Sequence, residues 1–126
     1  MKVLVVDDSA IVRVRLAELV AELQGIDLVA QAGDAEQAFE LVSSLKPDVV
    51  ILDVRMPSGS GIDLIEEIKR AQQAAKIIML TNYPSPENRE QSFTRGADYF
   101  FDKSGEIEEV IRVLQDLGRE RAGQPH

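Results

Sequence analysis

Short apolar runs alternate along the chain with segments in which apolar residues recur every three or four positions. The runs are rich in β-branched residues, as in VLVV at 3–6 and VVIL at 49–52, which is typical of strands buried on both faces. The pattern predicts strands at about residues 2–7, 27–32, 49–53, 76–81 and 98–102. It predicts helices at about residues 10–23, 35–45, 62–72, 86–94 and 106–117. Five successive strand–helix units indicate an α/β fold, a parallel sheet with right-handed crossovers and helices on both faces.

Residues near the helix ends agree with these boundaries. Asp34 and Ser104 can cap the second and fifth helices, Lys46-Pro47 ends the second helix, and Gly96 follows the fourth. The sequence shows no repeat, low-complexity segment or linker. We therefore expect one domain over residues 1–118, followed by a short, polar, frayed tail over residues 119–126 and no effector domain.

Composition narrows the class of protein. The 126 residues include no cysteine, which excludes disulfides and zinc–thiolate sites. Fourteen Lys and Arg against 22 Asp and Glu give a net charge of -8, which argues against nonspecific binding to nucleic acid or anionic membranes. The N-terminus lacks a signal-peptide pattern, and no apolar stretch approaches the roughly 20 residues that span a bilayer. These features predict a cytoplasmic protein.

Three aspartates follow two of the predicted strands. Asp7 and Asp8 come directly after the first apolar run, and Asp53 comes after the third. The carboxyl ends of parallel strands share one edge of the sheet, where ligands bind in open α/β folds. Carboxylates gathered there repel one another, and a hard divalent cation such as Mg2+ relieves that repulsion while keeping room for water and phosphate. The aspartates therefore predict a site for metal and phosphate.

Two further groups follow the later strands. Thr81 ends the run IIMLT and Lys103 follows YFFD, so a hydroxyl and an ammonium are expected at the same edge. A threonine at a strand end is usually a turn residue, and a single lysine is usually solvated surface. Their combination with the three aspartates favours a functional site.

Four segments carry a resemblance to a known family: VLVVDDS, VVILDVRMPSGSGIDLI, IIMLT and GADYFFDKS. Over essentially its whole length the chain resembles the receiver domain of two-component response regulators. The resemblance implies a flavodoxin-like (βα)5 fold, a doubly wound five-stranded parallel sheet with strand order 2-1-3-4-5. It also implies that Asp53 accepts a phosphoryl group from the phosphohistidine of a sensor histidine kinase or a histidine phosphotransfer protein.

The resemblance also implies roles around Asp53. Mg2+ would be bound by Asp8, Asp53 and the main-chain carbonyl of Arg55, and by Asp7 through water. Lys103 would pair with a phosphoryl oxygen, and the Thr81 hydroxyl would take another.

A conformational switch is the next implication. When Thr81 moves toward the phosphoryl group, the ring of Phe100 would turn inward and repack the surface of the fourth helix, fifth strand and fifth helix. That surface would bind a downstream protein target, and the chain would be a monomer or a phosphorylation-dependent dimer. The competing interpretation is that Phe100 is an ordinary core aromatic, and its neighbours Tyr99 and Phe101 leave the assignment by spacing open.

The resemblance also implies that the first helix is the kinase-docking element, because that region of receivers docks against the phosphodonor. Four of its apolar residues recur at helical spacing and are predicted to face the sheet: Leu16, Leu19, Val20 and Leu23. Ile11, Val12 and Arg15 lie nearer the acidic residues and are the candidate contacts with the phosphodonor.

Two positions depart from the commonest receiver pattern. Ser104 follows Lys103, where the family often has proline with a cis bond, so the isomer of this bond is open. Arg55 and Tyr83 stand two residues beyond Asp53 and Thr81, at the rim where water would attack the phosphoryl group. Their bulk predicts slow self-dephosphorylation.

Three alternatives remain. The chain would equally resemble a receiver cut from a DNA-binding transcriptional regulator. A haloacid-dehalogenase-type Mg2+ phosphohydrolase also uses an aspartyl nucleophile, but it usually places two aspartates two residues apart after the first strand. A flavodoxin-like flavin carrier would need a Ser, Thr and Gly-rich phosphate loop where this chain has DDSAIVRVRL.

Overall fold

The computed structural model describes residues 1–56 and 59–122. Five parallel strands form its main sheet: β1 (Lys2–Val6), β2 (Leu28–Ala32), β3 (Val49–Leu52), β6 (Lys76–Thr81) and β7 (Tyr99–Asp102). Their order is β2-β1-β3-β6-β7, which is the predicted order 2-1-3-4-5. The predicted α/β fold is confirmed.

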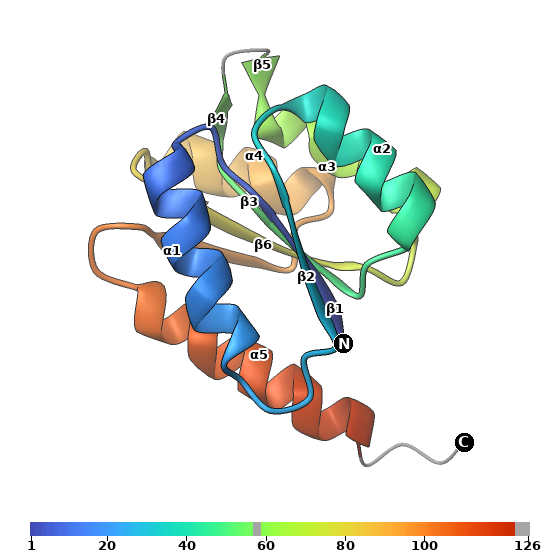
Figure 1. Ribbon diagram of the computed structural model, residues 1–126. Coiled ribbons are helices and arrows are strands. Elements are labelled where there is room, and N and C mark those ends of the chain that lie inside the picture. The colour runs from blue at the N-terminus through green and yellow to red at the C-terminus, as the bar shows by residue number, and fades with distance from the viewer. Residues whose placement is uncertain (57–58, 123–126) are drawn as a thin grey trace.

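Helices cover both faces of the sheet (Figure 1). They are α1 (Ala10–Ala21), α2 (Ala35–Leu45), α3 (Gly61–Ala71), α4 (Pro86–Arg95) and α5 (Ile107–Ala122). Helices α1 and α5 lie on one face, and α2, α3 and α4 lie on the other. Along β1, Leu4 packs toward the second group and Val5 toward the first, and both are fully buried. Burial on both faces explains why the central strands read as continuous apolar runs.

Helix α1 packs on the sheet with a slightly different face from the predicted one. Leu16 and Val20 are buried as expected, and Leu23 packs partly buried against the same core. Leu19 is 41% exposed, so its assignment to the core is wrong, and Ala17 is buried instead. Residues 16, 17 and 20 therefore form the buried stripe of the helix.

Most predicted helix ends are confirmed. The Asp34 carboxylate accepts a hydrogen bond from the Gln37 amide (2.8 Å) and caps α2. Lys46 ends that helix in the left-handed conformation, at φ 51°. Gly96 ends α4 at φ 117°, where the absence of a side chain makes the positive φ inexpensive.

The predicted cap at Ser104 is wrong. Helix α5 begins at Ile107, and the Ser104 hydroxyl instead donates to the Asp102 carboxylate (2.7 Å). The Glu106 carboxylate accepts the Asp102 amide (2.9 Å), and the Asp102 carbonyl accepts the Glu106 amide (2.8 Å). These bonds close a turn between β7 and α5 that delays the start of the helix.

A short antiparallel pair that the pattern did not predict follows β3. Strands β4 (Arg55–Met56) and β5 (Gly59–Ser60) are two residues each, too short to leave a periodic signal. Gly61 comes next, and a Cβ atom there would lie 1.8 Å from the Asp53 carbonyl oxygen. A glycine is therefore required for α3 to start this close to the acidic residue.

Helix α5 extends five residues past its predicted end, through Ala122. Arg121 in its last turn pairs with Asp48 (2.7 Å), and basic side chains favour a helix C-terminus. The predicted tail is therefore helical over residues 119–122, and residues 123–126 lie outside the described part of the chain. Within the described residues, no helix is long and apolar enough to cross a membrane.

Candidate functional site

The strand register brings the predicted site residues together at the carboxyl edge of the sheet. Val6 lies beside Leu52, so Asp7 and Asp53 leave neighbouring strands at the same level. Oxygen atoms of Asp7, Asp8 and Asp53 lie within 4.8 Å of one another. In Figure 1 this is the end of the sheet where β1 leads into α1 and β3 leads toward β4. The predicted acidic cluster is present.

Lys103 neutralises part of this charge. Thr81 pairs with Asp102 across β6 and β7, so Lys103 leaves the sheet at the same edge. Its Nζ donates to Asp7 Oδ2 (2.6 Å) and to Asp53 Oδ2 (2.8 Å), and all three side chains are at most 8% exposed. Burial lowers the pKa of Lys103, but the hydrogen bonds and charges of Asp53 and Asp7 outweigh burial and raise the pKa above its ordinary value.

The two buried carboxylates differ in how fully they are bonded. Asp7 Oδ1 accepts the Ser9 amide (2.9 Å), which completes the bonding of that group. Asp53 Oδ1 is buried and has no hydrogen-bond partner among the described residues. A buried acceptor left unpaired costs about 1–3 kcal/mol. An unpaired oxygen beside two more carboxylates fits a hard divalent cation, which takes oxygen ligands.

Thr81 connects this pocket to the loop after β6. The residue is fully buried, and its hydroxyl accepts the Tyr83 amide (3.0 Å). Its carbonyl accepts the Lys103 amide (2.8 Å), which ties β6 to the lysine on the neighbouring strand. The Lys103–Ser104 bond is trans, since the described residues contain no cis peptide.

Arg55 and Tyr83, the two residues predicted at the rim, are in contact with each other. The Arg55 guanidinium lies 3.9 Å from the centre of the Tyr83 ring, in a cation–π contact. Both side chains are exposed. The sequence predicts each residue separately, and their direct contact could not be inferred, because it depends on how two loops fold toward each other.

The strand pleat distinguishes the three aromatic residues of β7. Phe100 is 5% exposed and packs with the residues beneath α3, whereas Tyr99 and Phe101 face α5 and stack with ring centres 6.2 Å apart. The Arg89 guanidinium of α4 lies 5.9 Å from the centre of the Phe100 ring. In this conformation Phe100 is a core aromatic in contact with α4.

The candidate docking residues lie at the start of α1. Ile11 is 81% exposed, Arg15 is exposed and Val12 is partly buried. Val14 is also 42% exposed and lines the same shallow hollow as Ile11 and Arg15, although the sequence did not single it out. The sequence did contain a signal for Val14, because it follows Ile11 by three residues and residues three apart are neighbours on a helix surface.

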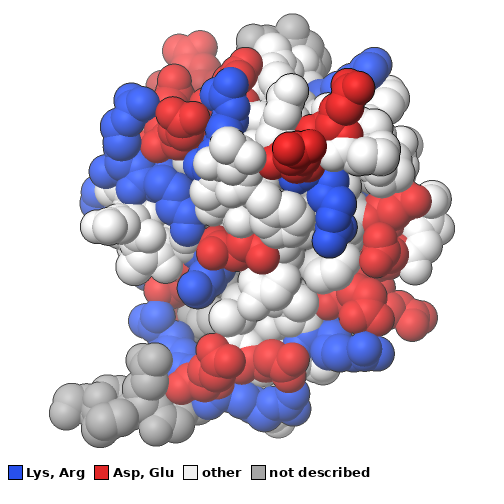
Figure 2. Space-filling model, turned by 180° about the vertical axis from the view of Figure 1, so that it is seen from behind, with Lys and Arg blue, Asp and Glu red and all other residues white. Residues whose placement is uncertain are grey.

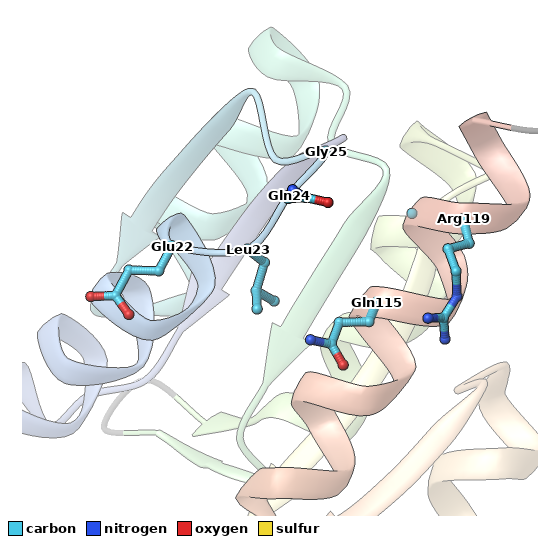
Figure 3. A pocket seen from close by; sticks show the side chains of 7 residues that line it. Glu22, Leu23, Gln24, Gly25, Gln115 and Arg119 are labelled. Atoms are coloured by element: carbon cyan, nitrogen blue, oxygen red, sulfur yellow. The ribbon is translucent and has the colours of Figure 1, made fainter.

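A second hollow of about 600 Å3 lies between the α1–β2 connection and α5 (Figure 3). Its lining includes Leu23, Gln24, Gly25, Gln115 and Arg119. It opens near the amino end of the sheet, away from the aspartates, so it is separate from the acidic pocket. On the face seen in Figure 2, acidic side chains gather along the right edge, and acidic and basic side chains are interspersed over the rest.

Comparisons with known proteins agree with this geometry. The family model of the response regulator receiver domain matches residues 3–115. Transcriptional regulatory protein PdtaR of Mycobacterium tuberculosis is 36% identical over 114 residues, which are 90% of this chain and 55% of the relative. The DNA-binding transcriptional activator DevR/DosR of the same organism is 33% identical over 121 residues, 96% of this chain and 56% of that protein.

Solved structures extend the likeness. A response regulator from Burkholderia pseudomallei, solved with a phosphorylated aspartic acid, calcium ion and citrate, superposes with a TM-score of 0.83 at 28% identity. The match covers 96% of this chain and 70% of that structure. The chain spans about half the length of the curated relatives that it matches. The family match favours a receiver over the two alternatives, a phosphohydrolase and a flavin carrier. The fold, the cluster of Asp7, Asp8 and Asp53 and the family match over residues 3–115 all agree. The chain therefore belongs to the response regulator receiver domain family.

Proposed function

We propose that Asp53 is the phosphoacceptor of this receiver and that phosphorylation requires Mg2+. The observation that carries the proposal is the unpaired, buried Asp53 Oδ1 beside Asp7 and Asp8, with Lys103 on the other Asp53 oxygen. The Burkholderia pseudomallei relative, whose structure contains a phosphorylated aspartic acid and a calcium ion, supports the same chemistry here.

Phosphoryl transfer needs alignment and charge neutralisation more than covalent assistance. Asp8, Asp53 and the Arg55 carbonyl would bind Mg2+ directly and Asp7 through water, and the ion would supply positive charge to the phosphoryl oxygens. The Lys103 ammonium is already within hydrogen-bond distance of Asp53 and would pair with a phosphoryl oxygen. Because these positions are fixed by strand ends, little reorganisation is needed during transfer.

The donor is a phosphohistidine of a sensor histidine kinase or a histidine phosphotransfer protein. One Asp53 oxygen attacks phosphorus, and the phosphorus–nitrogen bond breaks with its electron pair remaining on the imidazole. The product is an acyl phosphate, which is a mixed anhydride. Because water hydrolyses this bond, phosphorylation is temporary. The exposed start of α1, with Ile11, Val12 and Arg15, is the proposed docking surface for this donor.

Output would pass through α4, β7 and α5. Movement of Thr81 toward the phosphoryl group would free space for the ring of Phe100, whose backbone and ring already contact Arg89 of α4. The altered surface would bind a downstream protein in the cytoplasm, as a monomer or a phosphorylation-dependent dimer.

A second candidate is a receiver that belongs to a longer DNA-binding transcriptional regulator. The observation that favours it is length, since this chain spans 55% of PdtaR and 56% of DevR/DosR. DNA binding would then reside in the additional domain. Sequencing the gene past the codon for His126 tests this directly: a continuing reading frame supports the longer regulator, and a stop codon supports the single-domain form.

We expect Mg2+ to raise the melting temperature through Asp8 and Asp53. At a concentration about 100-fold above its Kd, a ligand of the native state adds about 2.7 kcal/mol of stability, which corresponds to about 10 °C here. Melting should be followed against Mg2+ for wild type, Asp8→Asn and the control Asp116→Asn, which changes an exposed carboxylate on α5. The control should respond like wild type, and Asp8→Asn should respond much less. An equal rise in all three proteins would refute the proposed ligands.

Opening the rim should shorten the life of the phosphorylated form. The Arg55 guanidinium lies 3.9 Å from the centre of the Tyr83 ring. On the proposed roles, both side chains border the path that water needs for in-line attack. Replacing Arg55 with Asn or Glu together with Tyr83→Ala should speed phosphate release by about an order of magnitude, since access to a near-attack geometry controls the rate. Because the two side chains are in contact, their single effects should not add.

Phosphate release from purified phosphorylated protein in Mg2+ buffer measures this effect. The Mg2+ affinity of the double variant should stay close to that of wild type, which separates the rim from the metal site. If the double variant decays no faster, steric protection is the wrong explanation for the two residues.

A further inference from the structure

We propose that Arg13 is a positioning residue for the cation site, and that it acts by fixing the peptide between Asp7 and Asp8. The inference deepens the proposed function and rests on it, because it concerns the same site. Arg13 lies on the first turns of α1 and is only partly exposed.

The guanidinium of Arg13 joins three elements. Its Nη1 donates to the Asp7 carbonyl at the end of β1 (2.8 Å), and its Nε donates to Gln31 Oε1 on β2 (3.3 Å). A Cβ atom on Gly33, just after β2, would lie 3.1 Å from Nη1, so a glycine there leaves room for the arginine. The side chain is thus held between α1 and the ends of two strands.

The carbonyl that Arg13 binds belongs to the peptide that connects Asp7 to Asp8. That peptide is planar, so a rotation of it displaces the backbone of both residues together. Asp7 and Asp8 each offer an oxygen within 4.8 Å of Asp53. By holding the carbonyl, Arg13 keeps two of the three carboxylates in register with the third.

The sign of the effect on Mg2+ affinity separates this role from simple electrostatics. A guanidinium close to the acidic cluster repels a cation, so an arginine that acted only as a charge would weaken Mg2+ binding. Removing it would then strengthen binding. Positioning predicts the opposite result, because carboxylates that lose their alignment bind the cation less well.

Titration with Mg2+ alone tests the proposal, by calorimetry on wild type, Arg13→Met, Arg13→Lys and the control Arg70→Met. Arg70 is an exposed arginine on α3, so the control removes one positive charge without touching the site. We expect Arg13→Met to bind Mg2+ about tenfold more weakly, at the low end of losses for groups that orient metal ligands. Arg13→Lys, which keeps the charge but not the two-pronged contact, should be intermediate, and Arg70→Met should match wild type.

A second readout needs no metal. The Ser9 amide donates to Asp7 Oδ1 (2.9 Å), so its hydrogen exchange should accelerate in metal-free Arg13→Met if the Asp7–Asp8 peptide has lost its anchor. Unchanged exchange at Ser9, or Mg2+ affinity in Arg13→Met equal to or tighter than wild type, would overturn the proposal. If Arg13→Met does not fold, Arg13→Lys decides: wild-type affinity in that variant would equally overturn it. Failure of wild type itself to bind Mg2+ would reject the proposed metal site, and the role of Arg13 with it.

Discussion

Asp53→Asn is expected to abolish phosphorylation while leaving the fold intact. The substitution keeps the shape of the side chain but removes the carboxylate nucleophile, and Lys103 retains its bond to Asp7. Purified protein should be incubated with a small phosphodonor and Mg2+, and the adduct followed by intact mass. Wild type should form an adduct that hydroxylamine removes, as an acyl phosphate requires, and Asp53→Asn should form none.

The matched control is Asp63→Asn, which neutralises an exposed carboxylate on α3 that pairs with Arg95. This variant should be phosphorylated at the wild-type rate. Incorporation by Asp53→Asn at that same rate would show that another residue is the phosphoacceptor, even if both variants melt normally.

Lys103→Met should produce the largest loss of stability, but mainly in the absence of Mg2+. The lysine is the partner of two carboxylates that are 5–6% exposed, and removing it leaves both charges buried without a cation. Breaking a buried ion pair in this way costs about 3 kcal/mol or more. A divalent cation bound by the same carboxylates would replace the missing charge, so saturating Mg2+ should restore most of the loss.

Urea unfolding with and without Mg2+ measures this difference, with Lys76→Met as a control that removes an exposed lysine at the other end of β6. A loss of the same size in both conditions would contradict charge compensation as the role of Lys103.

Lys103→Ala should still accept phosphate slowly but transmit the signal poorly, since the ammonium orients the phosphoryl group and links it to β7.

The pKa of Lys103 sets the pH window for that experiment. Because the folded pKa is raised above the ordinary 10.5, the stability that the ammonium contributes is fully present below about pH 10. It is lost only as the pH rises through the higher folded value. Titration of this lysine should therefore contribute nothing to the difference between wild type and Lys103→Met from about pH 6 to pH 9.

The sequence was sufficient for the fold and for the acidic pocket because both depend on strand ends. In a parallel sheet, Asp7, Asp53 and Lys103 must emerge at one edge wherever the helices lie. The sequence left the choice among Tyr99, Phe100 and Phe101 open, and the alternation of side chains along β7 separates Phe100 from its two neighbours.

Contacts that depend on helix orientation or loop folding were out of reach. The choice between Leu19 and Ala17 depends on the rotation of α1 about its axis, which the spacing of apolar residues fixes only to within a residue. The same rotation carries Arg13 to the Asp7 carbonyl. The stack of Arg55 on Tyr83 joins two loops, and the displaced start of α5 follows from bonds within one turn.

Tyr83 belongs to two connections at once. Its backbone amide donates a hydrogen bond to the Thr81 hydroxyl, and its backbone carbonyl accepts one from the Asn88 side chain on the first turn of α4 (2.9 Å). Its ring makes the cation–π contact with Arg55. On the proposed roles, the residue that shields the phosphoryl group from water is also the residue that passes the movement of Thr81 to α4. The two roles use different groups, since the ring shields the phosphoryl group and the backbone amide and carbonyl link Thr81 to α4. A substitution of the Tyr83 side chain could therefore change the duration of the signal and leave the bonded path to α4 in place.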